Sequence, residues 1–451
     1  MTLKPLPQQD IMTAYMLENP VAGIFADPGL GKTRATLDAI KALKAEGLVR
    51  GVLIVSPVRV TTLTWPDEVA KWGGLTAVNL RTPQGVQAWN DASADIYLIN
   101  YEMLPKFVAT CMKGRKRLPA DMVVWDELSK ARNPSSTRIR AFLPYRKKFT
   151  RHVGLTGTPA PNSDLDLFAP VRLLDGGLRL GPSYFAFRQR YAESDYQGYK
   201  WTLRPGASDQ IRERIRDMTL VLRAEDWLNI PPVTVEDIDV ALPDLVMKQY
   251  KQMQKEMLVE INSKEVTALT AAALVQKLAQ FASGAVYSTD EDTDTRTVVP
   301  VHDVKVKALK ELHQSIGRKP MLVYTQFTHE TDRIVAEIPG AQKFDEKKVP
   351  DWNAGKIPMW VSNPKECGIG LSLQGTCHHV CWFTLGYSNE DYIQSNARIA
   401  RTGQKNPTTI YRLLATRTVD WAMAEVLRSK EENQASLKDM LRHINVLASA
   451  K

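Results

Sequence analysis

The stretch "VAGIFADPGLGKTRATLDAIKALKAEG", Val21–Gly47, decides how the first part of the chain folds. It begins with a short apolar run that predicts a buried strand, and it ends with apolar residues at helical spacing. Between them lies "ADPGLGKT", Ala26–Thr33. A glycine-containing turn between a strand and a helix is the context that a phosphate-binding loop requires.

Each residue of this turn has a predicted task. Glycines 29 and 31 let backbone N–H groups surround a phosphate at a helix N-terminus. Lys32 is expected to reach the β- and γ-phosphates of ATP, and Thr33 to hold Mg²⁺. The strict pattern has glycine where this chain has Ala26, and the alternative is a glycine-rich turn with an incidental lysine. The predicted nucleotide-binding set is Pro28, Gly29, Leu30, Gly31, Lys32, Thr33 and Arg34.

A second acidic motif complements this loop. In "VVWDELSK", apolar residues run into Asp126 and Glu127 at a predicted strand end, where open α/β sheets place their ligands. We expect Asp126 to anchor Mg²⁺ and Glu127 to accept a proton from the water that attacks the γ-phosphate. The alternative is that the two acids only cap the following helix.

The pattern around these motifs indicates two α/β lobes. Apolar runs at 21–27, 52–57, 96–100, 122–127 and 152–158 alternate with helical segments, which predicts a doubly wound parallel sheet. The alternation returns after 301, with strands at 321–327, 359–363, 378–384 and 408–416. We predict a first lobe over 1–240 with a helical insertion at about 165–228, and a second over 241–451 preceded by linking helices at about 245–282.

Composition limits the class of protein. The net charge of +9 and pI near 9.2 favour a polyanionic partner. The longest apolar runs fall short of a membrane span and the N-terminus lacks an apolar signal core, so we expect no membrane partner and a cytoplasmic location. The cluster "CGIGLSLQGTCHHVCW" allows a zinc site, but "HHVCWFT" is more typical of a buried strand.

Seven motifs now stand in a recognisable order. They are "ADPGLGKT", "VLIVSPVRVTTLTWPDEVAKW", "INYEML", "DELSKARNPSS", "LTGTPAPN", "CGIGLSLQ" and "QSNARIARTGQ". In order and spacing the chain resembles superfamily-two helicases over nearly its whole length. The resemblance is closest to the Swi/Snf-like branch of DNA translocases, in its compact bacteriophage form. It implies two RecA-like lobes with helical insertions between the core motifs. One departure is Ser129, where the family often has histidine.

The resemblance implies further roles in the first lobe. Gln9 in "LPQQ" looks like the family's adenine-reading glutamine, with Gln8 as the alternative. Nucleic-acid contact or coupling is implied for Ser56, Arg59, Asn100, Tyr101, Thr156 and Thr158.

The segment "QSNARIARTGQ", Gln394–Gln404, supplies the second lobe's contribution. Arg398 and Arg401 are one helical turn apart, so both are expected to point at one phosphate from the same face of a short helix. Gln394 and Gly370 would complete the cleft. The alternative is a solvated basic face.

Together the motifs and the resemblance predict an ATP-dependent translocase or helicase that moves along DNA, and the resemblance implies duplex over single-stranded DNA. The basic clusters "KGRKR" from Lys113 and "RKK" from Arg146 are expected to add backbone contacts, with solvated loops as the alternative. The rival functions are an RNA helicase and an ATP-gated module that holds DNA without moving. If the chain is phage-encoded, its location would be the host cytoplasm.

Overall fold

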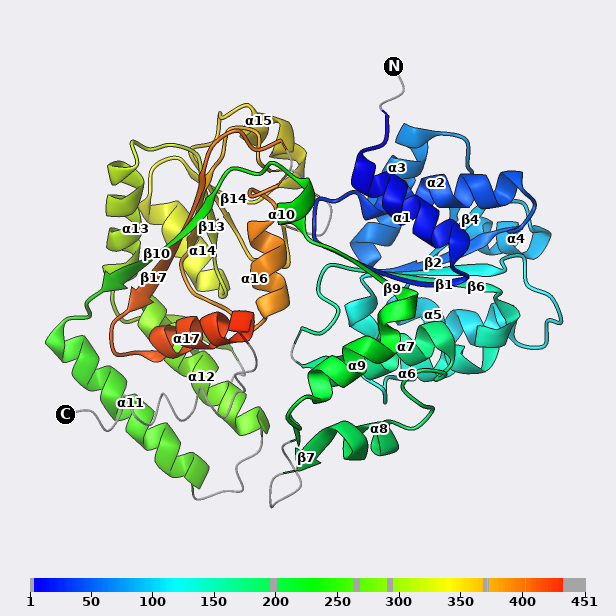
Figure 1. Cartoon of the computed structure of the whole chain (residues 1–451). Coiled ribbons are helices and arrows are strands. Elements are labelled where there is room, and N and C mark those ends of the chain that lie inside the picture. The colour runs from blue at the N-terminus through cyan, green and yellow to red at the C-terminus, as the bar shows by residue number, and fades with distance from the viewer. Residues whose placement is uncertain are drawn as a thin grey trace. The chain divides into compact units, whose positions relative to one another are not determined.

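The computed structural model describes residues 4–161, 163–194, 201–262, 268–289, 295–367, 371, 373–401 and 403–432. These fall into two compact units, Met1–Leu228 and Asn229–Lys451. Each unit contains a parallel β-sheet with helices packed on it (Figure 1). The predicted α/β class with two parallel-sheet lobes is therefore confirmed.

The first unit is built on a seven-stranded sheet in the order β3-β4-β2-β5-β6-β1-β9, and all its pairs are parallel. The central strand β5 is buried along its whole length, because both faces of a parallel sheet are covered by helices. The strands are β1 (Val21–Ala26), β2 (Val52–Ser56), β3 (Ala77–Asn79), β4 (Ile96–Asn100), β5 (Met122–Asp126), β6 (Arg151–Thr156) and β9 (Thr219–Leu222).

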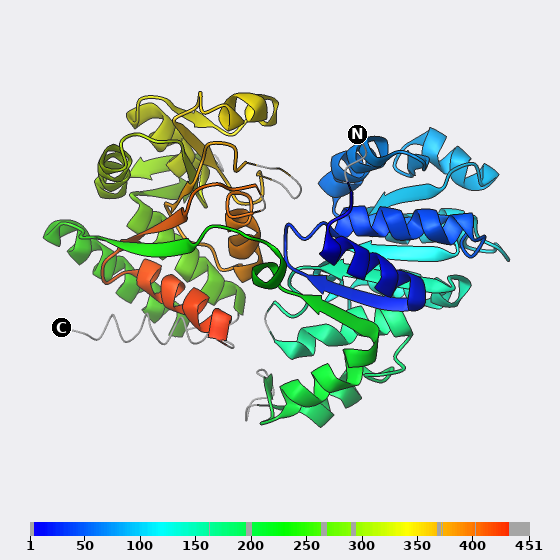
Figure 2. The same cartoon turned by 45° about the horizontal axis from the view of Figure 1, so that its top comes forward.

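Helices cover both faces of this sheet. Figures 1 and 2 show α1, α2 and α3 on one face, and α5, α6 and α7 on the other. The helices are α1 (Pro7–Glu18), α2 (Lys32–Ala45), α3 (Trp65–Trp72), α4 (Pro83–Asp91), α5 (Leu104–Phe107), α6 (Thr137–Phe142), α7 (Phe168–Asp175), α8 (Tyr184–Tyr191), α9 (Ala207–Ile215) and α10 (Ala224–Trp227).

The predicted helical insertion at 165–228 also contains strands, which corrects the sequence analysis. β9 joins the main sheet beside β1, and β7 (Ala192–Ser194) pairs with β8 (Trp201–Leu203) as a hairpin. β9 has few residues and is half-exposed along most of its length, so it carries no strong apolar pattern.

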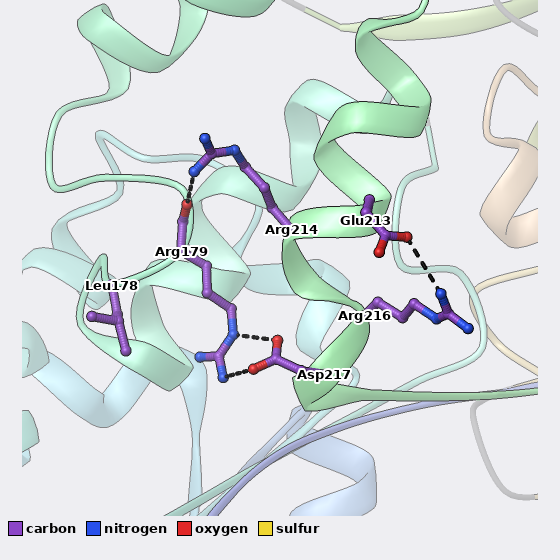
Figure 3. Close-up of a pocket in the computed structure, with 6 residues that line it drawn as sticks. All are labelled: Leu178, Arg179, Glu213, Arg214, Arg216 and Asp217. Atoms are coloured by element: carbon purple, nitrogen blue, oxygen red, sulfur yellow. Dashed lines mark hydrogen bonds and ion pairs between the residues drawn. The ribbon is translucent and has the colours of Figure 1, made fainter.

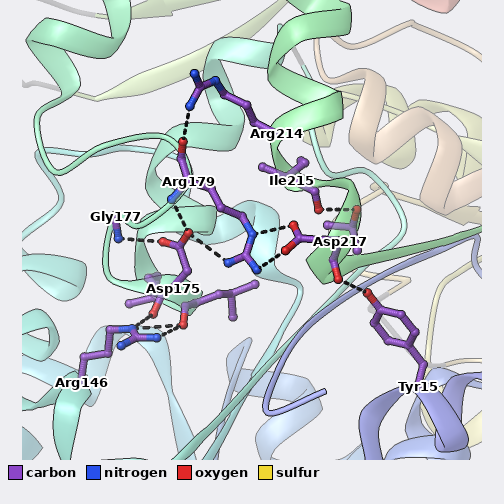
Figure 4. A network of polar contacts seen from close by, with 11 residues as sticks. Tyr15, Arg146, Asp175, Gly177, Arg179, Arg214, Ile215 and Asp217 are labelled. Carbon is purple, nitrogen blue, oxygen red and sulfur yellow. Dashed lines mark hydrogen bonds and ion pairs between the residues drawn. The ribbon is translucent and has the colours of Figure 1, made fainter. Parts of the chain in front are cut away.

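Polar contacts join this insertion to α1 (Figure 4). Arg179 donates to Asp217 at 2.7 and 2.6 Å and also bonds to Asp175, which is almost fully buried. The hydroxyl of Tyr15 on α1 donates to the carbonyl of Asp217 at 3.2 Å. The insertion is thereby held against the helix that carries Gln9.

A groove beside this network carries balanced charge (Figure 3). Its lining includes three arginines, but Arg179 is paired with Asp217 and Arg216 with Glu213. Arg214 donates to the carbonyl of Arg179 at 3.3 Å. The groove therefore presents little surplus charge to a polyanion.

The second unit has a six-stranded parallel sheet in the order β10-β17-β16-β13-β15-β14. β10 pairs with β17 along its whole length, which explains why the unit begins at Asn229 and not at the predicted residue 241. The strands are β10 (Val233–Val240), β13 (Met321–Tyr324), β14 (Ala341–Lys343), β15 (Met359–Ser362), β16 (His379–Trp382) and β17 (Thr408–Ala415).

Alternating side chains of β13 enter two cores on opposite faces of this sheet. Met321 and Val323 pack with residues of α13 and α14, whereas Leu322 and Tyr324 pack with residues of α12, α16 and α17. The helices are α11 (Asp244–Asn262), α12 (Ala268–Ser283), α13 (Val304–Ser315), α14 (Thr328–Glu337), α15 (Val349–Asn353), α16 (Asn389–Asn396) and α17 (Val419–Glu432).

Two further features of this unit bear on the sequence analysis. Helices α11 and α12 occupy the positions of the predicted linking helices, but the hairpin of β11 (Ala285–Thr289) and β12 (Arg296–Pro300) had no predicted counterpart. The predicted strand around Cys381 is confirmed as β16, and Cys381 is fully buried. Within the described ranges, none of the helices combines the length and apolar character that a bilayer crossing needs.

Candidate nucleotide-binding site

The predicted phosphate-binding loop connects β1 to α2. Gly29 and Gly31 adopt φ angles of 91° and 84°, a left-handed conformation that glycine adopts without steric cost. Lys32 begins α2, and its Nζ donates to the carbonyls of Ala26 at 2.6 Å and Asp27 at 3.3 Å. The loop thus has the helix N-terminus and the backbone shape that bind a phosphate.

Gln9 lies against this loop. A Cβ built on Gly31 would approach the Gln9 Nε2 to 2.1 Å, so the side chain of this glutamine lies directly against the loop. The Gln9 Oε1 accepts a hydrogen bond from the backbone N–H of Leu6 at 2.9 Å. Gln8 is instead buried, with 2% of its surface exposed. Of the two glutamines weighed from the sequence, Gln9 is the one beside the loop.

The remaining loop residues differ in their surroundings. Leu30 is fully buried, whereas Pro28 and Thr33 are half-buried. A Cβ on Gly157 would lie 3.0 Å from Pro28, so the "LTGTP" segment runs beside the loop. Arg34 bonds to Asp38 at 2.5 Å and stacks on Trp72 at 3.7 Å. Its guanidinium is thus held by one residue of α2 and one of α3, and its nucleotide contact stays a prediction.

The acidic pair stands at the end of β5. Asp126 is 9% exposed and accepts hydrogen bonds from the indole N–H of Trp65 at 2.9 Å and the backbone N–H of Glu127 at 3.0 Å. Burial raises the pKa of Asp126, and the Trp65 bond and the positive charge of Lys32 oppose this shift. The effect of Lys32 shows that the loop and the acid are close enough to interact.

Glu127 has an unusual backbone. Its φ of 55° is positive, which costs a non-glycine residue about 1–3 kcal/mol. The hydroxyl of Tyr101 donates to the carbonyls of Asp126 at 3.1 Å and Glu127 at 3.3 Å. Tyr101 is 1% exposed, so the phosphate contact predicted for it does not fit its position. It supports the acidic turn from the core.

Other predicted nucleic-acid residues are also largely internal. Ser56 is fully buried and shares a 2.7 Å hydrogen bond with Thr61. Asn100 donates to Glu102 at 2.7 Å, and its Oδ1 is buried with no hydrogen-bond partner among the described residues. The Oγ1 of Thr156 accepts from the Thr158 N–H at 3.1 Å. Arg59 is half-buried just before the π-helical turn η1 (Val60–Thr64).

The arginines of the second unit are arranged differently from the prediction. Helix α16 ends at Asn396, so Arg398 and Arg401 follow it in a turn and do not share one helix face. The reason is a change of hydrogen bonding, because the N–H of Arg398 bonds to Ser395, three residues earlier. Gln394 lies on α16 and donates to Glu390 at 3.4 Å.

The guanidinium groups of Arg398 and Arg401 each lie close to other residues of the second unit. Arg401 Nη1 donates to the carbonyl of Leu371 at 3.0 Å. Burial raises the pKa of the Cys367 thiol to about 11, and the charge of Arg398 is among the effects that oppose the shift. Gly370, predicted to complete the cleft, lies outside the described residues.

Sequence reasoning missed Trp65 as part of this site. Its motif "TLTWPDEVAKW" was recognised, but an apolar aromatic carries no sign that its N–H will meet a carboxylate. The signal that could have found it is the pairing of β2 with β5, which brings the segment after β2 to the end of β5.

Comparisons with known proteins agree with the seven motifs. Residues 11–283 match the family described as SNF2-related domain. A "Putative protein p41" of Acyrthosiphon pisum secondary endosymbiont phage 1 is 31% identical, over 98% of each chain. An "Uncharacterized ATP-dependent helicase" of Mycoplasma pneumoniae is 24% identical over 92% of this chain, and mouse "DNA repair and recombination protein RAD54B" is 23% identical over 93%. The chain spans 40% and 54% of those two relatives.

One solved structure supports the fold. The Pyrococcus furiosus Hef helicase domain superposes with a TM-score of 0.54 at 15% identity, over 94% of this chain and 98% of that domain. At this identity the likeness concerns architecture. The predicted resemblance to Swi/Snf-like helicases, in a form also found in phages, is confirmed by the family match and the phage relative.

Proposed function

The chain belongs to the SNF2-related family and is a nucleic-acid-dependent ATPase; from this premise we propose that it uses ATP hydrolysis to move along double-stranded DNA. The observation that carries the proposal is the acidic pair at the end of β5, in which Asp126 is buried within electrostatic reach of Lys32 and Glu127 is half-buried. An acid and a phosphate-binding loop on neighbouring segments are what hydrolysis of a nucleoside triphosphate needs.

Each residue of the first unit's site has a proposed role. Lys32 and the N–H groups of residues 29–31 bind the phosphates, and Gln9 reads the adenine edge beside them. Thr33 and Asp126 would hold Mg²⁺, which when bound neutralises charge on the phosphate oxygens. The half-buried hydroxyl of Thr33 and the anionic oxygens of Asp126 are the hard ligands that Mg²⁺ prefers.

Glu127 is the proposed general base. Its left-handed backbone, supported by Tyr101, sets the direction in which its side chain leaves β5. A carboxylate in this place accepts a proton from the attacking water. A binding module that only holds DNA needs no such base, so the acid pair favours turnover over the rival clamp function.

The second unit would contribute arginines. Arg398 and Arg401 are proposed to meet the γ-phosphate when ATP is bound, and Gln394 and Gly370 are proposed to complete this part of the site. A planar guanidinium stabilises charge on transferring phosphoryl oxygens. To do so, Arg398 would move away from Cys367, and Arg401 would leave the carbonyl of Leu371 to which it donates.

DNA contact is proposed for the surface of the first unit near Arg59 and Thr158. The Thr158 hydroxyl is buried with no hydrogen-bond partner among the described residues. The basic clusters contribute less than their charge indicates, because Arg146 bonds to the carbonyls of Leu173 and Leu174, and Lys148 to that of Arg115 at 2.6 Å. Support for DNA over RNA comes from the name of the mouse relative, a DNA repair and recombination protein.

The proposed location is the host cytoplasm of a phage, which the phage relative supports. The function is tested with a duplex that carries a triplex-forming third strand beyond the loading site. We expect ATP-dependent release of the third strand by the parent protein and none by Glu127→Gln. Binding of ATP and DNA without hydrolysis or release would favour the clamp, and release only from RNA-containing substrates would favour an RNA helicase.

A further inference from the structure

Trp65 contacts the proposed metal ligand directly. It is fully buried at the start of α3, and its indole N–H donates to Asp126 Oδ2 at 2.9 Å. The contact follows from topology. Strand β2 pairs with β5, and the turn η1 leads from β2 straight into α3. The indole therefore reaches the carboxylate at the end of the neighbouring strand.

Two neutral donors hold the carboxylate of Asp126. Trp65 bonds to one oxygen, and the backbone N–H of Glu127 bonds to the other at 3.0 Å. A neutral donor fixes the orientation of a carboxylate but leaves its charge in place. Each oxygen keeps a second lone-pair direction for a further ligand. The indole ring is rigid and packed on all sides, so it permits little rotation of the side chain that it holds.

We propose that Trp65 is the positioning residue that orients Asp126 for Mg²⁺, and so links the segment after β2 to the metal site. The inference rests on the proposed ATPase function. Groups that orient a metal ligand through a hydrogen bond change metal affinity or activity by about 10–100-fold when they are lost. The segment that begins with Ser56 and Arg59 carries predicted DNA contacts, and Trp65 follows it directly. Movement there would reach the metal ligand through one hydrogen bond.

The chain offers a matched control in Trp89. It is also fully buried in the first unit, and its indole N–H donates to the carbonyl of Cys111 at 3.3 Å. It packs edge-to-face against Tyr97 and Phe107 at ring-centroid distances of 4.9 and 5.0 Å. Replacement by Phe removes a buried hydrogen bond and ring volume at either tryptophan, but only Trp65 touches the acidic pair.

The test measures binding of a fluorescent ATP analogue to the full chain, in Mg²⁺ and in EDTA, together with the Mg²⁺ concentration that gives half-maximal hydrolysis. For Trp65→Phe we expect binding in Mg²⁺ to weaken about tenfold, with the half-maximal Mg²⁺ concentration rising by about the same factor. Binding in EDTA should match the parent. Trp89→Phe should match the parent in both conditions.

Equal losses in Mg²⁺ and EDTA, or no difference between the two variants, would overturn the inference. Should Trp65→Phe not fold, 3-benzothienylalanine at position 65 keeps the ring shape, lacks the N–H, and carries the same expectations. A different result is expected if the proposed ATPase function is itself wrong. In that case the parent itself would show no Mg²⁺-dependent binding or hydrolysis.

Discussion

A buried aspartate lies beside the strand ends in each unit, and the two are compensated in opposite ways. Asp126 in the first unit accepts hydrogen bonds from two neutral donors, the Trp65 indole and the Glu127 N–H. Asp420, the second residue of α17, forms an ion pair with Lys305 at 2.6 Å, and both side chains are almost fully buried. Lys305 also donates to the carbonyl of Phe383 at 2.8 Å.

The difference distinguishes an aspartate that stabilises the fold, Asp420, from one that is placed to take part in catalysis, Asp126. Lys305 cancels the charge of Asp420, so that pair joins α13 to the end of β16 and the start of α17 and attracts no ion. Asp126 lies close to a phosphate-binding loop, and burial raises its pKa, so its anionic form carries a cost in stability that a bound cation would offset. On this account, the way in which the charge is compensated distinguishes Asp126, which is placed for chemistry, from Asp420, which stabilises the fold.

The largest expected effect concerns the first unit's acid pair. Glu127→Gln should bind ATP normally and lower kcat by about 10²–10⁴-fold, because it removes a general base. Lys32→Ala should instead weaken ATP binding. Single-turnover hydrolysis and equilibrium nucleotide binding separate the two. The same Glu→Gln change at the fully buried Glu330 of the second unit is the control, and it should retain turnover. Near-parent turnover in Glu127→Gln would refute the assignment.

The same chemical change in the two aspartates tests the comparison itself. Asp420→Asn leaves Lys305 buried without its counter-charge and should cost about 3–5 kcal/mol of unfolding free energy. Asp126→Asn removes a buried charge that is hydrogen-bonded by neutral donors, keeps an acceptor for Trp65, and should change stability by less than about 1 kcal/mol while abolishing hydrolysis. Urea unfolding followed by tryptophan fluorescence measures both. A larger stability loss in Asp126→Asn would break the comparison.

A smaller effect is expected for Arg401, which the second unit is proposed to contribute to ATP hydrolysis. Arg401→Lys keeps the charge but loses the planar fork, so kcat at saturating ATP and DNA should fall about tenfold or more. ATP affinity without DNA should stay unchanged. The basic-face alternative predicts the opposite, with normal kcat and weaker DNA binding at raised salt. The measurement is steady-state hydrolysis across DNA concentrations.

The smallest expected effect concerns His329, a histidine of the second unit that is buried in its neutral form. His329 is 2% exposed between the rings of Tyr287 and Phe327, and burial lowers its pKa to about 4. The unfolded chain takes up this proton near pH 6.5, so stability should be full above that pH and fall as the pH drops towards 4.

For His329→Leu we expect the difference in unfolding free energy between about pH 7.5 and about pH 5 to shrink by about 1–2 kcal/mol. Denaturant titrations of parent and variant at the two pH values measure it. An unchanged pH dependence would show that His329 becomes protonated without unfolding.

Most of the fold was predictable because its strands are buried on both faces and read as unbroken apolar runs, as in Val52–Ser56 and Met122–Asp126. Edge strands were missed for the complementary reason. β10 is exposed along most of its length, and its place in the second sheet depends on pairing with β17, far away in sequence. The first-unit boundary was therefore drawn too late.

The chemistry of the site was predictable where one residue type has one use, as for Lys32 and Asp126. The contacts that hold these residues in place could not be predicted from the sequence. Tyr101 was assigned to DNA, but its hydroxyl holds the main chain of the acidic turn, and Trp65 went unassigned. Arg398 and Arg401 have helical spacing, but α16 ends before both. Spacing predicts a shared face only while the helix continues.

The central claim is that the first unit's acid pair hydrolyses ATP when the protein is on duplex DNA. The most direct measurement is the steady-state ATPase rate of the parent chain with no nucleic acid, duplex DNA, single-stranded DNA and RNA, each at saturation, with Glu127→Gln as the blank. We predict that duplex DNA stimulates the rate most and that the blank stays flat throughout. A parent rate that no duplex changes, or one that RNA raises more than duplex DNA does, would contradict the account.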